Sequence, residues 1–463
     1  MKGIIDTADT YGWDTVFGIH IGDVNAAIIK AGSSPKSFDV ADPDDAVSAT
    51  GTFGDWQLIS GGSGEIVRLQ IPIQTAEIHS PGNTDKVINA TALVDVRLNF
   101  LHQKDPTGKS SHHLRVRTKP ASVDESIVTI WQIVYQQQQK LSFIGKAAFR
   151  ELLALWLNEN LDSFDHVFAT VDLNRVADKG AFQWMQPTDV SYAYSDFGAD
   201  DGVLAVLCMT GHRPSAGLIQ QASPKLIPDR ERAGLLISRN RMLSELILPL
   251  MPQVFDGSKP ADYKISASGD SILNAHQGIR FTVHPKDKDP YTATVQELSV
   301  TIDGEELQME VLTKADVSPG IYAWCRTQNF LAIKLINKPD GTQTLGYEPT
   351  RTVPPAHWTT KDPGIEITEE ILGLVALIAT AIAIVVTAGA AIPVIAMIIG
   401  LAAGVMALTT TIIEDVGNGD APAIGDLVLN ASAAIIWPDS KDFALTTAGL
   451  NSSLQLGGNP SFA

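Results

Sequence analysis

Two short segments of this 463-residue chain carry residue types that could act on a phosphate or an ester. Gly108-Lys109-Ser110 imitates the end of a phosphate-binding loop, and Gly269-Asp270-Ser271 contains a serine of the kind that serves as a nucleophile. The first segment fails because the opening glycine of GxxxxGK[ST] would fall at Gln103, and because a strand is expected to follow where a helix is needed. The second fails because it lacks an identifiable base and orienting group; His276 is too close along the chain. A hairpin turn and an exposed serine are the better interpretations.

Metal chemistry is equally unsupported by the spacing of possible ligands. His112 and His113 are adjacent on an expected strand, so they point to opposite faces and cannot hold one ion together. None of the ten histidines belongs to an HExxH or HxH motif, and the acidic run at 42–45 lacks the glycine and distal glutamate of a calcium loop. We therefore predict no catalytic residues, no metal and no cofactor, and a protein that is not an enzyme.

The elements that surround these segments are predicted to be antiparallel strands with a few long helices. Val96, Leu98 and Phe100 alternate with polar residues, as in a half-buried strand. Asp303-Gly304 is a strong hairpin turn, and a helix is expected over about 142–158. Strands and helices do not alternate regularly, so the pattern favours an α+β fold over a doubly wound sheet.

The chain is organised around a long apolar stretch near its C-terminus. The 43 residues from 371 to 413 include no Asp, Glu, Lys or Arg. Gly389 and Pro393 interrupt the stretch, which predicts an apolar helical hairpin within 366–415. Thr368 can cap the first helix, with Glu369 placed where the helix dipole favours negative charge.

Three environments could hold this stretch: a bilayer, the centre of a large soluble core, or the wall of an apolar cavity that holds lipid. Each arm approaches the length that spanning requires. The flanks are acidic (Glu369, Glu370, Glu414 and Asp415), so the basic flank and aromatic belt typical of a membrane span are absent. Soluble burial or lipid contact is favoured, and insertion after a trigger such as low pH remains an alternative.

Composition narrows the partners and the compartment. A formal net charge of −18 argues against nucleic acid and against electrostatic docking on anionic lipid, so any membrane contact should be apolar and local. Two cysteines, Cys208 and Cys325, exclude a disulfide scaffold and favour a reducing compartment, with one optional bridge between them as the alternative. The first residues form no long apolar segment, which predicts a cytoplasmic protein or one exported without a classical signal peptide.

Several sequence blocks together resemble one known family. The most specific is GDWQLISGGSGEIVRLQIPI at 54–73, supported by blocks at 10–17, 164–174, 182–194, 234–249 and 437–458. They are similar to the clostridial forty-seven-kilodalton protein family of the orfX-type botulinum neurotoxin cluster, within the tubular lipid-binding (TULIP) superfamily. The resemblance runs from about residue 10 to 460.

The resemblance implies an elongated fold in which a strongly curved antiparallel sheet wraps long helices. We expect that body over 1–355, with a sub-boundary near 230–260, then the hairpin, then a strand-like tail over 416–463 that packs back on the body. It also implies a non-enzymatic role in binding lipid or another amphipathic ligand as a toxin-associated accessory protein. The alternative is a chaperone-like partner of a co-encoded toxin or a related TULIP protein, with no small ligand, bound through an acidic surface and exposed sheet edges.

The residues predicted to contact an apolar ligand are the large side chains of the expected hairpin. A buried acyl chain could contribute several kcal/mol there without any charge contact, at about 25 cal/mol per Å². Simple core packing is an equally good interpretation of the same side chains. The candidates are Ile371, Leu374, Ile378, Ile382, Ile395, Ile399 and Met406.

Overall fold

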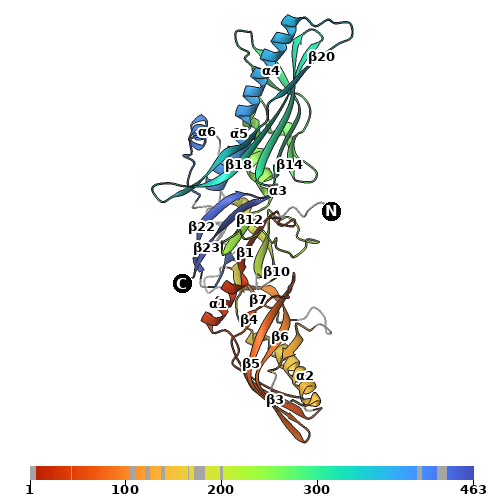
Figure 1. Cartoon of the computed structure of the whole chain (residues 1–463), viewed down its shortest axis with the longest axis vertical. Helices are drawn as coiled ribbons and strands as arrows, with labels where there is room; N and C mark the ends of the chain where they lie inside the picture. Colours follow the sequence, from red (N-terminus) through yellow and green to blue (C-terminus); the bar gives the residue numbers. More distant parts are fainter. Residues whose placement is uncertain are drawn as a thin grey trace.

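Alternating apolar and polar residues build three antiparallel sheets, which follow one another along the longest axis of the molecule (Figure 1). In β5, for example, side chains from Val67 to Ile73 are buried at every second position, as a half-buried strand requires. The computed structural model describes residues 7–42, 44–104, 110–119, 126–136, 141–164, 166–171, 183–198, 202–403, 409–424, 435–438 and 440–462. The predicted α+β class with curved antiparallel sheets is confirmed.

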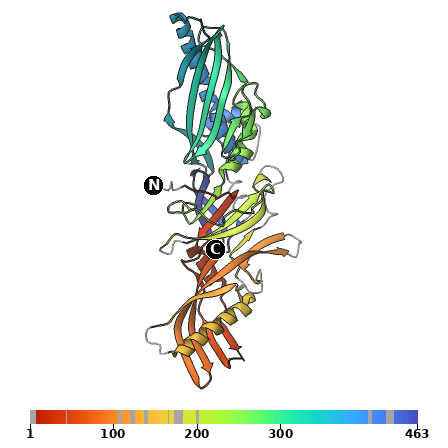
Figure 2. The ribbon, with the colours of Figure 1, turned by 90° about the vertical axis from the view of Figure 1, so that its right-hand side faces the viewer.

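The lower sheet curves around helix α2, which spans Phe143–Glu159 (Figure 2). Ser142 begins this helix as predicted, because its hydroxyl accepts a hydrogen bond from the Gly145 N–H at 2.8 Å. The predicted hairpin of this region is also present, since Leu98 pairs with Val116. The strands of this sheet are β2 (Ser37–Asp42), β3 (Val47–Phe53), β4 (Gln57–Leu58), β5 (Ile66–Ser80), β6 (Asn83–Lys104), β7 (Ser110–Val116), β8 (Val128–Val134), β9 (Ala169–Val171) and β21 (Ile435–Ile436).

The central sheet joins the two ends of the described chain. Its first strand pairs with β11 and β12, and β12 pairs in turn with the last strand. Helix α1 (Ile21–Ala31) follows the first strand directly and ends at Gly32, which takes the left-handed conformation. The strands are β1 (Thr15–His20), β10 (Pro187–Asp196), β11 (Gly202–Thr210), β12 (Ala233–Ile237), β22 (Ser440–Leu450) and β23 (Leu454–Phe462).

The upper sheet holds the long apolar helix on its concave face (Figure 2). Asp303-Gly304 forms the predicted hairpin turn between its two central strands, with Gly304 at a φ of 55°. The strands are β13 (Tyr263–Ile265), β14 (Ser271–Asn274), β15 (Ile279–Val283), β16 (Tyr291–Asp303), β17 (Glu306–Ser318), β18 (Ile321–Asn337), β19 (Gln343–Thr352) and β20 (Ala356–Lys361).

Short helices connect the central and upper sheets. A turn of α-helix, α3, leads into a π-helix and then a 3-10 helix. These segments are α3 (Arg239–Arg241), the π-helix Met242–Ile247 and the 3-10 helix Leu248–Gln253, with further 3-10 turns at Leu161–Ser163, Gln183–Met185 and Pro260–Asp262.

The predicted apolar hairpin is wrong: the stretch forms one bent helix of 34 residues, Glu369–Ala402. It comprises α4 (Glu369–Gly389), Ala390 and all but the last residue of α5 (Ala391–Ala403). Ala390 keeps right-handed helical angles, and its N–H bonds to Val386 O at 2.8 Å. Gly389 does not adopt the left-handed conformation that would reverse the chain. Pro393, which lacks an N–H, lies in the first turn of α5 and accounts for a bend rather than a reversal. Helix α6 (Thr410–Gly417) follows.

Candidate functional site

Helix α4 lies against β15, β17, β18 and β20 with one side fully buried. Val375, Ile378, Ala379, Ile382 and Val386 recur at helical spacing on that side and are at most 2% exposed. The thiol of Cys325 on β18 approaches Ala379 O at 3.7 Å, which fixes how closely the helix meets the sheet. Burial raises the pKa of this thiol to about 11. Both cysteines are free and buried.

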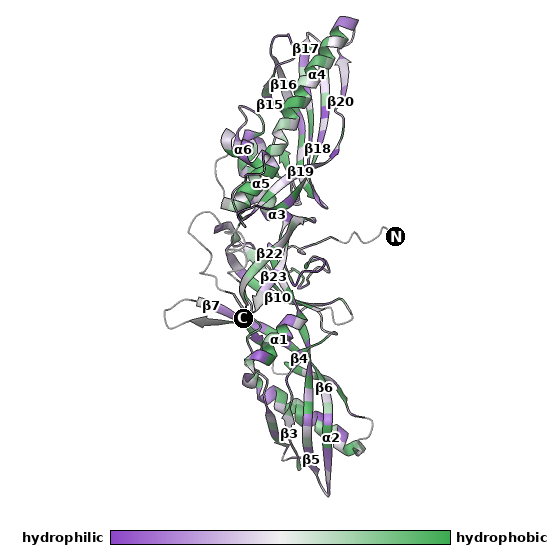
Figure 3. Ribbon diagram, turned by 60° about the vertical axis from the view of Figure 1, so that its left-hand side comes forward, coloured by the Kyte–Doolittle hydropathy of each residue, from purple (hydrophilic) through white to green (hydrophobic). Residues whose placement is uncertain are grey.

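The lower half of the bent helix is entirely core. A Cβ on Gly400 would lie 2.7 Å from a methyl of Leu246 in the π-helix, and one on Gly389 would lie 2.8 Å from Val254 O. These two glycines therefore allow a close approach that a larger residue would prevent. Figure 3 shows the continuous hydrophobic colouring of α5 in this region.

The candidate ligand residues fall into three groups in the structure. Ile378, Ile382, Ile395 and Ile399 are at most 1% exposed and belong to the main hydrophobic core. Ile371 and Leu374 are half-buried and pack against the edge of that core. Met406 lies outside the described residues.

The outer side of α4 is exposed and uncharged, which the sequence did not reveal. Leu372, Leu377 and Ile384 are 49%, 39% and 65% exposed. The Thr380 hydroxyl bonds back to Ala376 O at 2.8 Å, so its methyl group is left to face outward. With about 100° of rotation per residue, the exposed positions occupy one arc about 160° wide. We call them the α4 outer face: Leu372, Gly373, Ala376, Leu377, Thr380, Ile384, Thr387 and Ala388.

The start of the helix is built as predicted. Thr368 Oγ1 accepts a hydrogen bond from the Ile371 N–H at 3.4 Å, and Glu369 and Glu370 occupy the first turn. By length and composition the 34-residue helix could also cross a membrane, a test that a core helix of a soluble protein passes equally well.

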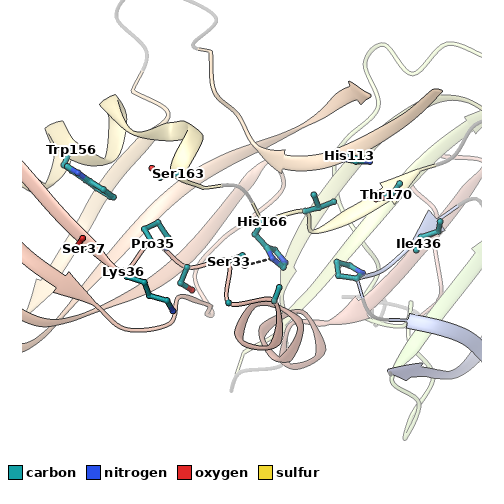
Figure 4. Close-up of a pocket in the computed structure, with 15 residues that line it drawn as sticks. Ser33, Pro35, Lys36, Ser37, His113, Trp156, Ser163, His166, Thr170 and Ile436 are labelled. Atoms are coloured by element: carbon teal, nitrogen blue, oxygen red, sulfur yellow. Dashed lines mark hydrogen bonds between the residues drawn. The ribbon is translucent and has the colours of Figure 1, made fainter. Parts of the chain in front are cut away.

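A concavity of about 810 Å³ opens beside the lower sheet, lined by the end of α1, the segment that leads into β2, the end of α2 and strands β7, β9 and β21 (Figure 4). Ser33 Oγ lies 2.8 Å from His166 Nδ1, and the ring of His166 meets Phe168 edge-on. Burial, followed by the charge of Arg115, lowers the pKa of His113 and so favours the neutral imidazole. The wall of this concavity combines hydroxyl, imidazole and apolar groups. The lining residues are Ala31, Gly32, Ser33, Ser34, Pro35, Lys36, Ser37, His113, Trp156, Ser163, His166, Val167, Thr170, Ile436 and Pro438.

The rejected motifs have structural roles where the structure describes them. The Asp270 carboxylate accepts hydrogen bonds from the hydroxyls of Ser266, Ser268 and Ser271, which lower its pKa and close a turn. His276 pairs with Asp262 at 3.2 Å rather than with Ser271. The 108–109 part of the phosphate-loop imitation lies outside the described residues. Within the part of the chain that the structure describes, no three His, Cys, Asp or Glu side chains cluster as metal ligands would.

Curved antiparallel sheets that enclose long helices define an elongated α+β, helix-wrapping class of protein. Residues 10–458 match the OrfX-like family model, described as Protein OrfX2/OrfX3/P47. The chain therefore belongs to the OrfX/P47 family of the botulinum neurotoxin cluster, whose members are not known as enzymes.

Two curated relatives and two solved structures support this placement. Protein OrfX3 of Paraclostridium bifermentans is 31% identical over 97% of this chain and 98% of its own length. Protein OrfX3 of Clostridium botulinum (strain Kyoto / Type A2) is 30% identical over the same shares. The structure of P47 from Clostridium botulinum A2 matches 98% of both chains with a TM-score of 0.61 and 17% sequence identity. P47 of Clostridium botulinum E1 gives a TM-score of 0.59.

Proposed function

We propose that this protein is a non-enzymatic accessory protein of a toxin-type cluster that binds a lipid or another amphipathic ligand along the α4 outer face. The observation that carries the proposal is the exposure of Leu377 and Ile384 on a helix that presents no charge between Glu370 and its end. Soluble proteins seldom leave such a continuous apolar strip in water without a partner.

The chemistry of the strip suits an acyl chain. Leu377 and Ile384 are seven residues apart on the same side of the helix, and Thr380 is the exposed residue between them. Covering about 200 Å² of apolar surface would contribute roughly 5 kcal/mol to the free energy of binding, without any charge contact. The net charge of −18 fits this mode, since electrostatic attraction to anionic lipid is not required.

The earlier candidate residues then take a supporting role in the proposal. Ile371 and Leu374 border the strip and can contact a bound chain from the side. Ile378 and Ile382 hold α4 on the sheet, so they reach a ligand only if the helix lifts away.

The test is native mass spectrometry of the purified protein with organic extraction, followed by uptake of a pyrene-labelled phospholipid. We expect near-stoichiometric lipid on the unmodified protein. The double change Leu377→Asp, Ile384→Asp should reduce affinity at least about tenfold, because two charges would face the acyl chain.

The matched control is Ile219→Asp, an isoleucine that is 53% exposed on the central body and outside the strip. It should take up lipid like the unmodified protein. An unmodified protein that neither carries nor takes up lipid, or a double variant that binds normally, would contradict the proposal. In the first case the outer face would instead be a surface for a protein partner.

A further inference from the structure

Strand β20 is an exposed edge of the upper sheet. It pairs with β18 without a register shift, from Ile321 opposite Lys361 to Arg326 opposite Ala356. Within the described residues, no other strand pairs with it, and no backbone hydrogen bond from a turn or loop reaches it before Asp362. Its residues are exposed except Thr359, which is half-buried. A row of backbone N–H and C=O groups therefore faces solvent.

Two other edges of these sheets are protected, in contrast to β20. On β8, the Asn158 side chain bonds Val128 N and Val128 O, and Arg150 donates to Ile130 O at 2.6 Å. Strand β13, at the far edge of the upper sheet, has only three residues. Short edges and covered edges are the usual protections against edge pairing. By contrast, β20 has no proline and one charged residue, Lys361, at its end.

An aromatic ladder ends on this strand. The rings of Trp324 on β18 and Trp358 on β20 stack with centroids 5.9 Å apart and planes within 4°. The Lys314 ammonium lies over Tyr322 at 3.6 Å and over Trp324 at 5.8 Å, which closes the inner end of the ladder. Trp358 is 39% exposed, because no further strand continues the row at the edge.

We propose that two copies of this chain associate through β20, which pairs antiparallel with β20 of the second copy about a two-fold axis at Trp358. Trp358 then stacks on Trp358 of the second copy and continues the ladder across both sheets, because cross-strand aromatic pairs stabilise antiparallel strands. A symmetric interface places the same residue on both sides of the axis, which a self-complementary ladder satisfies.

The register follows from the side chains. Residues that face each other across two antiparallel strands point to the same face of the sheet, whereas neighbouring residues in one strand point to opposite faces. The two-fold axis must therefore lie between the two copies of one residue, which then pairs with itself. An axis at Trp358 sets Thr359 opposite His357 and Lys361 opposite Pro355, with no like charges facing. An axis at Thr359 would set Lys361 against His357 and leave each Trp358 opposite Thr360, which breaks the ladder.

The shape of the molecule allows this pairing. Figure 1 shows β20 at the upper end, with the strands of that sheet running close to the long axis. An antiparallel partner therefore extends beyond the upper end, and the central and lower sheets of the two copies point away from each other. The association is independent of lipid on α4, which lies on the opposite face of the sheet from Trp324 and Trp358.

The experiment is sedimentation velocity of the full chain from about 1 to about 100 µM, since dimer formation follows mass action. We expect a concentration-dependent shift to a species of twice the chain mass. Trp358→Glu and Trp358→Lys should each remain monomeric, because the axis places like charges directly opposite one another. Trp131→Glu is the matched control, a half-exposed tryptophan on the protected edge β8, and should dimerise normally.

A mixture of the Trp358→Glu and Trp358→Lys chains should recover the dimer, because opposite charges then meet across the axis. Recovery of the dimer in the mixture would show that each single variant stays monomeric because like charges meet at the axis, and not because the variant is unfolded. A protein that stays monomeric at every concentration would overturn the proposal. Dimerisation of both single variants, or failure of their mixture to dimerise when the unmodified chain does, would overturn it equally.

Discussion

The two long helices of this protein sit on similar curved sheets but present different sides to solvent. The outer side of α2 carries Lys146, Arg150, Glu151 and Glu159, apart from the exposed Phe143 and Ile144 of its first turn. Its polar side chains also serve the lower sheet, since Arg150 bonds β8. The outer side of α4 carries no charge along its exposed arc.

This difference is the basis for proposing a ligand site on α4 and not on α2. Phe149, Leu152 and Leu153 are at most 1% exposed and hold α2 on its sheet, while most of its outer side beyond the first turn is charged. The upper body achieves the same burial through Ile378 and Ile382, yet leaves a second apolar side uncovered. An uncovered apolar side adds nothing to the stability of the free protein, and this is the side to which the proposal assigns ligand contact.

The largest expected effect comes from charging the two sides of α4 separately. Ile378→Asp places a carboxylate in the core, where it should cost about 4 kcal/mol or more of unfolding free energy. Ile384→Asp, on the outer face, should change that free energy by no more than about 0.5 kcal/mol. Urea denaturation measures both. Equal destabilisation by the two changes would show that the outer face is also core, and the contrast with α2 would disappear.

A smaller difference should appear at the helix starts. Ser142 both caps Gly145 and donates to Asp85 Oδ2 at 2.8 Å, whereas Thr368 makes only a longer cap bond to Ile371. Ser142→Ala should therefore cost about 1–2 kcal/mol and Thr368→Ala about 0.5 kcal/mol. The midpoints of urea unfolding for the two variants, measured side by side, test this order. A greater loss from Thr368→Ala would mean that α4 depends on its cap more than on its packing.

Alkaline pH should weaken the contact between α4 and its sheet. The pKa of Cys325 is raised by burial to about 11, from an ordinary value of 9.0. Its stabilising contribution is present below about pH 9 and is lost towards pH 11, because the unfolded chain releases the thiol proton first; the total is roughly 2–3 kcal/mol. Cys325→Ala should be less stable at pH 7 but lose stability less steeply between pH 9 and 11. Parallel curves for both proteins would show that the thiol is not buried under α4.

The sequence predicted the architecture better than the site. Alternation in β6, the Asp303-Gly304 turn and the helix expected from about residue 142 depend on local signals, and each is present in the structure. The hairpin prediction failed because Gly389 and Pro393 permit either a reversal or a bend, and packing of α5 on the π-helix decides for the bend.

The outer face could not be predicted because α4 is apolar on all sides. In a helix with a polar side, such as α2, the periodicity of polar and apolar residues predicts which side is buried. A helix that is apolar on all sides gives no such signal. Ile378 and Ile384 are the same residue type in the same helix, and only the sheet distinguishes them, with exposures of 0% and 65%. The unprotected edge at β20 also depends on pairing, which is a property of the folded sheet.

The most direct measurement is photo-crosslinking with a phospholipid that carries a photoactivatable group in its acyl chain, followed by peptide mapping. We expect the crosslinked residues to fall within 372–388, on the α4 outer face, with Ile384 and Leu377 foremost. Crosslinks concentrated around Ser33 and His166, in the concavity beside the lower sheet, would contradict the account and move the ligand site there (Figure 4).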